Sequence, residues 1–143
     1  MRLAQHLLSI ETKPREIREI TREVSVWVEA QRIPRGLLIL FIKHTSASLL
    51  VQENYSPDVR RDITGFLARL APEDPSRYRH NDEGPDDMPA HLKALLTQVQ
   101  LTIPVMAGRL QLGTWQGIFL LEHRAAAHRR DVVLTLIGDG NDD

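Results

Sequence analysis

The sequence predicts a single α+β domain spanning residues 1–143. That length is ordinary for one domain, and a chain of this size buries about two-thirds of its unfolded surface. Apolar residues recur at helical spacing in the middle of the chain, whereas they alternate with a period of two after residue 100. Hydrophobic residues make up 42% of the sequence and charged residues 26%, which is typical of a soluble globular protein.

The first third of the chain predicts two strands with a helix between them. Leu3–Thr12 alternates in part and indicates a strand, which Pro14 ends. Thr21 can cap the helix that follows, and this helix must end before Pro34. A strand is the rival interpretation there, because three valines alternate (Val24, Val26 and Val28). Leu37–Ile42 is continuously apolar and indicates a buried strand.

The clearest helix signal begins at Ser56. A turn containing Ser46 and Ser48 comes first, with an extended segment over Leu49–Gln52. Ser56 is a typical N-cap, because a proline and an acidic residue follow it in the first turn. Pro72 ends the helix, whose apolar face comprises Val59, Ile63, Phe66, Leu67 and Leu70.

A polar loop over Asp74–Asp86 leads into a third helix, which Asp86 or Asp87 caps. We expect the apolar stripe of this helix to consist of Leu92, Leu95, Leu96 and Val99. The later alternation predicts an antiparallel meander, with strands at 101–105, 110–112, 113–122 and 132–137. The acidic tail at 138–143 is expected to be frayed.

Composition excludes several classes of function. The chain has no cysteine, which rules out disulfides, thiolate metal sites and a cysteine nucleophile. A net charge of −1 argues against nucleic acid as a partner, since such binding needs a basic surface. The N-terminus lacks the apolar core of a signal peptide, and no apolar run reaches the roughly 18 residues of a membrane span. We therefore expect a cytoplasmic protein with no membrane partner.

The strongest candidate site lies between Tyr78 and Lys93, where histidines and carboxylates crowd a loop that enters a helix. Asp87 and His91 are four residues apart, so they share one helix face and can form a hydrogen bond. His80 lies on the preceding loop, and two imidazoles with a carboxylate suffice to hold a divalent metal. The alternative interpretation is a solvated acidic loop whose aspartates cap the helix.

A second polar group follows the buried strand. His44, Thr45 and Ser46 stand at a strand end, where ligand-binding loops are common. Imidazole can bind a metal or exchange a proton, and hydroxyls can hold phosphate oxygens. The alternative is a strand end closed by a serine–threonine turn. Glu53 and Asn54 either join the same pocket or simply precede the next helix.

Basic residues and one tryptophan complete the candidates. Cationic side chains that can clamp a phosphate are scattered, at Lys43, Lys93, Arg109, Arg124, Arg129 and Arg130. Trp115 lies between two glycines, which indicates either an indole that lines a pocket or a core tryptophan at a strand kink. The sequence has no Gly-x-Ser-x-Gly elbow and no glycine-rich phosphate loop.

Six stretches form a distinctive series from His44 almost to the end of the chain: HTSASLLVQEN, SPDVRRDI, YRHNDEGPDDMPAHLK, LTIPV, GRLQLGTWQGIFLLEHR and RRDVVLTLIG. In this order they resemble the YjbQ family of small bacterial and archaeal proteins, some of which are described as secondary thiamine-phosphate synthases. The resemblance implies a mostly antiparallel, strongly curved sheet or sandwich packed with about three helices. It also implies a homotrimer whose polar site lies near the subunit boundaries.

The residue patterns and the resemblance together give three groups of candidate residues. The catalytic candidates are His44, Ser46, Asp87 and His91, and the candidate metal ligands are His44, His80, Asp86 and His91. The candidates for ligand contact are Thr45, Glu53, Asn54, Thr114, Trp115, Gln116 and Arg124. The sequence departs from the family pattern at Ser48, where glycine is frequent, and at His123, where an aromatic or aliphatic residue is usual.

Three functions follow as hypotheses. The first, implied by the resemblance, is a thiamine-phosphate synthase that joins hydroxymethylpyrimidine diphosphate to thiazole phosphate with the help of a divalent metal, zinc or magnesium. The second is a metal-dependent hydrolase of a small phosphorylated metabolite. The third is a non-catalytic trimer that binds a small molecule or a metal.

Overall fold

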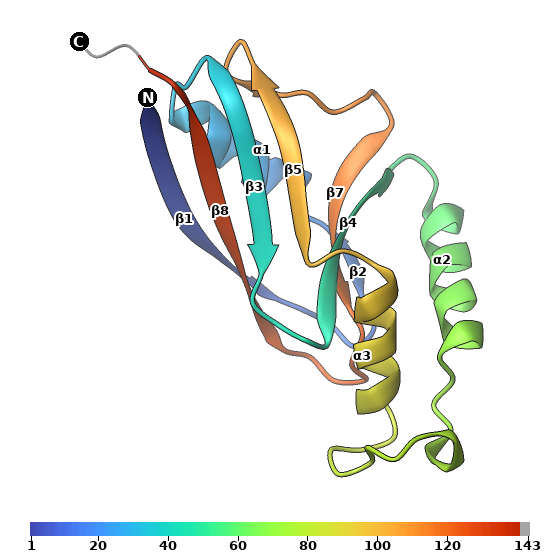
Figure 1. Ribbon diagram of the computed structural model, residues 1–143. Helices are drawn as coiled ribbons and strands as arrows, with labels where there is room; N and C mark the ends of the chain where they lie inside the picture. Colours follow the sequence, from blue (N-terminus) through green and yellow to red (C-terminus); the bar gives the residue numbers. More distant parts are fainter. Residues whose placement is uncertain (141–143) are drawn as a thin grey trace.

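The computed structural model describes residues 1–140 and shows two antiparallel sheets flanked by α-helices (Figure 1). In chain order the elements are β1 (Arg2–Glu11), β2 (Ile17–Glu19), α1 (Thr21–Ala30), β3 (Arg35–Ile42), β4 (Ala47–Glu53), α2 (Pro57–Leu70), the 3-10 helix η1 (Pro75–Arg77), α3 (Asp87–Leu96), β5 (Gln100–Met106), β6 (Arg109–Leu110), β7 (Gln116–Glu122) and β8 (Arg129–Asp139). The predicted α+β class is confirmed, with antiparallel pairing throughout these strands.

The predicted meander is correct for its first pair of strands, β5 and β6, and wrong for the strands that follow. The larger sheet has the order β1-β8-β3-β5-β6, and the smaller sheet has the order β2-β7-β4. Consecutive strands β6, β7 and β8 therefore do not pair with one another. Local alternation reveals that a segment is extended, but the choice of partner depends on burial contributed by distant strands. The short strand β2 and the 3-10 helix were not predicted.

The main core lies between α1 and the inner faces of the two sheets. Val24 and Val28 of α1 are buried there while Val26 is 60% exposed, so helical spacing decides between the two interpretations of this segment. Thr21 does not cap the helix as expected. Its hydroxyl accepts the backbone N–H of Ile118 in β7 instead, which ties the start of α1 to the smaller sheet.

Three apolar segments are less buried than their sequences predict, one of them α2, in which Phe66 and Leu70 are each 54% exposed. Alternate residues of β3 face opposite sides of the larger sheet, so Leu38 and Leu40 are buried while Leu37 and Phe41 are exposed. The predicted stripe of α3 is also wrong. Leucines 95 and 96 are exposed, and the helix buries Asp87, Pro89, Ala90 and Lys93. A helix can bury a charged residue when other groups pair with it, as they do for Asp87 below.

Some boundaries of helices and strands also differ from the predicted ones. Ser48 belongs to β4 rather than to a turn, and Asp86 precedes α3 without a capping hydrogen bond from its side chain. Gly138 and Asp139 of the supposedly frayed tail belong to β8, and positions 141–143 lie outside the described residues. Between residues 1 and 140, no helix is long and apolar enough to cross a membrane.

We expect Gly36→Ala to lower the free energy of unfolding by about 3 kcal/mol, because overpacking is costly where backbone cannot move. Gly36 faces Gly138 in the β3–β8 pair, and an added Cβ would overlap the carbonyl oxygen of Ile137. Chemical denaturation measures the loss. The control is Gly65→Ala in the middle of α2, which is expected to be neutral or stabilising because the added Cβ meets only the flexible end of Arg69, 3.4 Å away. Similar losses in both variants would contradict this account.

Candidate functional site

A histidine–aspartate–histidine group forms where the loop before α3 meets the helix. Asp87 and His91 lie one turn apart in α3, and His80 comes from the loop. The Oδ2 atom of Asp87 lies 2.8 Å from Nε2 of His80 and 3.1 Å from Nε2 of His91. One possible metal-ligating atom from each side chain lies within 4.8 Å of the other two. The structure thus brings together two of the three imidazoles that the sequence suggests as ligands, with a carboxylate beside both.

Thr45 fixes the orientation of His91. The Nδ1 atom of His91 lies 2.8 Å from the backbone carbonyl oxygen of Thr45. A carbonyl oxygen only accepts hydrogen bonds, so Nδ1 must carry a proton. In the neutral ring, Nε2 then presents its lone pair to the Asp87 carboxylate, and this contact needs a proton or a cation between the two atoms. Metal-binding histidines commonly have their other nitrogen held in this way, so the three side chains fit a metal ion.

Arg124 supports the carboxylates of this group. Its Nη1 atom lies 3.0 Å from Oδ1 of Asp87, and its Nε atom donates to Oδ2 of Asp86 at 2.9 Å. Burial opposes ionisation of Asp87, but the hydrogen bond from His80 and the Arg124 charge help to outweigh it, so the pKa of Asp87 is lowered. Asp86 is therefore linked to the group by Arg124, and its Oδ2 atom already accepts a hydrogen bond from that residue.

His44 does not join the group of metal-ligating atoms within one chain. Its Nε2 atom accepts the backbone N–H of Asp131 at 2.8 Å, and the Arg130 guanidinium lies 3.4 Å from Nδ1. Burial and the Arg130 charge lower the pKa of His44, so its ring is neutral at pH 7. Ser46 is buried and accepts a hydrogen bond from Arg130 at 3.0 Å. These two residues line an open depression next to Thr45 rather than the His80–His91 cluster.

A buried ion pair between Glu122 and Arg130 holds this segment in place. The Nε and Nη2 atoms of Arg130 lie 2.8 and 2.5 Å from the two carboxylate oxygens. Burial alone would raise the pKa of Glu122, but hydrogen bonds from Arg130 and Thr12 outweigh burial and lower it. Arg130 appeared among the scattered cations of the sequence, whereas Glu122 was missed. The sequence feature that could have identified Glu122 is its place as an acidic residue at the end of a strongly apolar strand.

The remaining candidates lie at the other end of the smaller sheet. Antiparallel pairing places Ala47 beside Glu122 and Glu53 beside Gln116, so the two ends are six residues, or about 20 Å, apart. The distal group consists of Glu53, Asn54, Thr114, Trp115 and Gln116. The Trp115 indole is 57% exposed and meets Tyr55 edge-on, with ring centroids 5.1 Å apart. One chain therefore does not unite the distal group with the His80–Asp87–His91 group.

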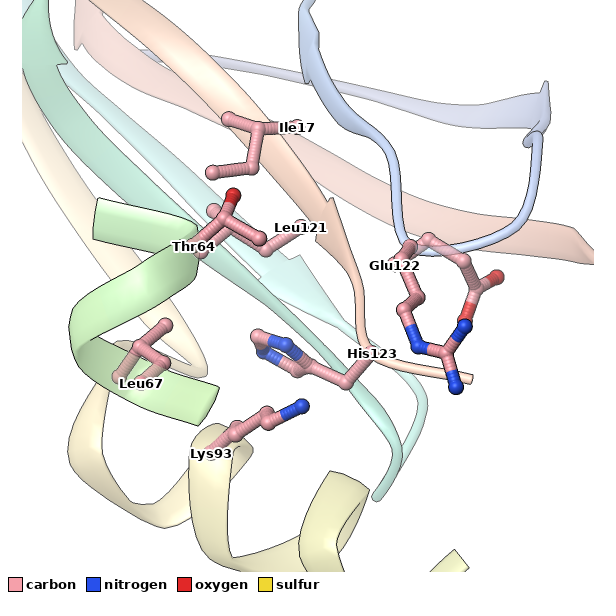
Figure 2. Close-up of a pocket in the computed structure, with 8 residues that line it drawn as sticks. Ile17, Thr64, Leu67, Lys93, Leu121, Glu122 and His123 are labelled. Carbon is pink, nitrogen blue, oxygen red and sulfur yellow. The ribbon is translucent and has the colours of Figure 1, made fainter. Parts of the chain in front are cut away.

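His123 is buried beside Lys93 and faces the cavity drawn in Figure 2. Its Nε2 atom lies 2.8 Å from the hydroxyl oxygen of Ser48. The two positions at which the sequence departs from the family pattern are therefore in direct contact. Burial, and then the charge of Lys93, lower the pKa of His123 to about 4.

This burial predicts a pH-dependent stability. Between pH 4 and 6.5 the unfolded chain protonates His123 while the folded chain does not, so stability is lost as the pH falls. The loss from this residue is expected to reach about 3 kcal/mol. Denaturation curves across this range measure it. His123→Phe should flatten the slope, whereas His6→Gln, at an exposed histidine of β1, should not. Identical slopes in the wild type and in His123→Phe would refute the assignment.

Comparisons with known proteins agree with this architecture. The family described as "UPF0047 protein YjbQ-like" matches residues 6–139. The UPF0047 protein sll1880 of Synechocystis is 45% identical over 135 residues, which cover 94% of this chain and 92% of that protein. The UPF0047 protein YjbQ of Escherichia coli O157:H7 is 42% identical over 136 residues, covering 94% and 98% of the two chains.

Solved structures show the same fold. Hypothetical protein APE1520 from Aeropyrum pernix aligns with a TM-score of 0.86 at 28% identity, covering 95% of this chain and 99% of that one. Conserved hypothetical protein TT1486 from Thermus thermophilus aligns with a TM-score of 0.76 at 41% identity, covering 91% and 99%. The fold, the family match and the extent of identity lead to one conclusion: the chain belongs to the YjbQ-like UPF0047 family.

Proposed function

We propose that this protein is a metal-dependent enzyme that acts on a small phosphorylated metabolite, with the metal held by His80, Asp87 and His91. The proposal rests on the convergence of their three ligand atoms within 4.8 Å. Two imidazoles and one carboxylate leave coordination positions open for water or substrate. This donor set suits zinc better than magnesium, which prefers oxygen ligands.

The surrounding residues prepare this site. When bound, a divalent ion supplies a polarised water or a contact to a phosphate oxygen. Arg124 keeps Asp87 ionised and in position, and the Thr45 carbonyl holds the proton of His91 on Nδ1. His44 lies on the same segment as Thr45, but its Nε2 lone pair already accepts the backbone N–H of Asp131 and would have to release it before taking a proton.

Within this class, thiamine-phosphate synthesis is the first reaction to test, because the family resemblance implies it. The reaction requires a cation for the departing diphosphate and favours an aromatic surface for the pyrimidine ring. Trp115 offers an exposed indole, but it belongs to the distal group. A site with both features therefore needs a second copy of the chain.

We propose a homotrimer, the assembly that the resemblance implies. The proposal is supported by the outer face of the larger sheet, where two rows of apolar residues cross strands β1, β8 and β3. One row is Leu3, Ile137 and Leu37, and the other is Leu7, Val133 and Phe41. The β1 and β3 residues of these rows are 45–61% exposed, and monomers rarely leave a contiguous apolar patch uncovered. Light scattering should give three times the chain mass of 16.3 kDa, and Phe41→Glu should dissociate the assembly. A monomeric wild type would overturn the proposal.

Untagged, zinc-loaded protein provides the test of activity. It is incubated with the two thiamine-phosphate precursors and, separately, with a panel of phosphomonoesters and nucleotides, and products are identified by mass spectrometry. Asp87→Asn keeps the side-chain shape but removes a charged ligand, so turnover should fall at least about 100-fold. Asp82→Asn, on the exposed part of the same loop, is the matched control and should retain activity. Saturable binding without turnover would indicate the non-catalytic alternative.

A further inference from the structure

Two hydrogen-bond donors face each other beside the candidate site, one on His44 and one on Arg130. The backbone N–H of Asp131 donates to Nε2 of His44 at 2.8 Å, so Nε2 must present a lone pair. An imidazole ring that accepts a hydrogen bond at one nitrogen is neutral and has its single proton on the other. The Nδ1 atom of His44 is therefore a donor, yet it lies 3.4 Å from Nη1 of Arg130, which can only donate as well.

These two donors cannot satisfy each other. The other two nitrogens of the Arg130 guanidinium already have acceptors, because Nε and Nη2 donate to Glu122 and Nη2 also donates to Ser46. Between residues 1 and 140, Nη1 has no hydrogen-bond partner besides the His44 ring. Arg130 is buried, and polar groups in such places are normally paired. An acceptor oxygen placed against both Nη1 and Nδ1 would satisfy the two donors together.

Both residues line an open depression with a volume of about 480 Å³. The depression is also lined by Lys43 and Thr45, two exposed residues that offer an ammonium group and a hydroxyl group. The described residues of the lining include no carboxylate. Glu122 balances the charge of Arg130, and Lys43 adds a further positive charge, so the depression favours a negatively charged acceptor over a neutral one.

We propose that this depression binds the phosphoryl group of the substrate. One phosphate oxygen accepts hydrogen bonds from Nδ1 of His44 and Nη1 of Arg130, and the other oxygens face the Thr45 hydroxyl and the Lys43 ammonium. A carboxylate has only two oxygens and would leave part of this donor set unused.

Thr45 connects this anion site to the proposed metal site. Its carbonyl oxygen holds the His91 ring, while the same residue lines the depression. A phosphoryl group bound here would therefore lie next to the proposed metal ligands. The identity of the substrate rests on the proposed function, whereas the anion site itself rests on the facing donors of His44 and Arg130.

Nitrogen NMR of the isotope-labelled wild-type chain tests the position of the His44 proton. Long-range spectra that connect ring nitrogens to ring protons distinguish the two neutral forms of a histidine. His44 should carry its proton on Nδ1, and inorganic phosphate should shift the Nδ1 resonance while leaving that of the exposed His6 unchanged. A proton on Nε2 of His44, or an Nδ1 resonance that does not respond to phosphate, would overturn the proposal.

Isothermal titration calorimetry measures the affinity for inorganic phosphate, with metal removed by a chelator and ionic strength held constant. His44→Phe keeps a ring but removes the donor, and it should weaken phosphate binding at least about tenfold. Lys43→Met removes an exposed charge and should weaken binding about threefold. Lys13→Met, at an exposed lysine outside the depression, is the matched control. Unchanged affinity in both His44→Phe and Lys43→Met would overturn the proposal.

The metal-free measurement separates this site from the proposed enzyme. Asp87→Asn removes a proposed metal ligand and should bind phosphate no more weakly than the wild type, because Asp87 does not line the depression. Phosphate binding that depends on His44 in a protein without turnover would leave the anion site standing and remove the enzyme. Turnover in a protein whose phosphate affinity ignores His44 and Lys43 would do the reverse.

Discussion

Replacing Arg130 with methionine is expected to lower the free energy of unfolding by about 3–5 kcal/mol at neutral pH, which is the usual cost of breaking a buried ion pair. The Glu122 and Arg130 side chains are 0% and 5% exposed, so water cannot take the place of the lost guanidinium. Glu122 would keep the hydrogen bonds from Thr12 and a backbone N–H, with Nδ1 of His128 3.6 Å from its carboxylate. Guanidinium chloride denaturation of both proteins gives the difference.

The pH dependence of this loss identifies its cause. In the wild type the pKa of Glu122 is lowered, so its stabilising contribution is present at neutral pH and is lost as the pH falls through the acidic range. In Arg130→Met the isolated carboxylate is destabilised by burial, and its pKa rises. The difference between the two proteins should therefore be largest at pH 7–8 and smaller near pH 4.

Two variants separate the ion pair from other effects. Arg129→Met changes the preceding residue, whose side chain is 67% exposed, and should cost little. Glu122→Leu combined with Arg130→Met removes both charges and should be more stable than Arg130→Met alone. The interpretation fails if Arg129→Met is as damaging as Arg130→Met, or if the double variant is the least stable of the three.

The ion pair also connects the core to the candidate site. Arg130 donates to Ser46 and lies beside His44, so it fixes both ends of the His44–Ser46 segment. The carbonyl group between them, that of Thr45, holds Nδ1 of His91. A protein that remains folded without Arg130 should therefore also hold the His91 ring less rigidly.

The helices were predictable where their signals are local. Ser56 caps α2 with its side chain, and the helix ends at Leu70 ahead of Pro72, as expected from neighbouring residues alone. The burial of α3 was not predictable in the same way. Leu95 and Leu96 face outward, and the helix instead buries Asp87, whose partners His80 and Arg124 come from other parts of the chain. Helical spacing carries no information about partners so distant.

The candidate site shows the same contrast between contacts that local spacing predicts and contacts between distant residues. The four-residue spacing of Asp87 and His91 predicted their contact, which is confirmed. The second nitrogen of His91 is held by the Thr45 carbonyl, a contact between residues 46 positions apart that local spacing does not reveal. The separation of the distal group follows from the β4–β7 register, which joins strands that are far apart in the sequence. Side-chain chemistry was therefore easier to predict than the relative placement of the groups.

His91→Ala is expected to weaken Zn²⁺ binding at least about 100-fold, because it removes a ligand whose lone pair is already oriented. The Thr45 carbonyl directs Nε2 of this ring toward Asp87, so the ring of the wild type is already oriented before Zn²⁺ binds. Competition with a chromophoric chelator gives the affinities. Substitution with Co²⁺ adds a spectrum that reports the coordination geometry, and its visible bands should be lost in the variant.

The comparison among histidines is what makes this test specific. His80→Ala should weaken the metal less than His91→Ala, since His80 comes from a loop and its side chain is 44% exposed, against 31% for His91. His6→Ala removes an exposed histidine outside the cluster and should leave the affinity unchanged. His44→Ala tests whether His44 binds the metal. If no second chain brings His44 to the cluster, the Co²⁺ spectrum of this variant should match that of the wild type. Zinc affinity that survives the combined loss of His80 and His91 would place the metal elsewhere and remove the basis of the proposed enzyme.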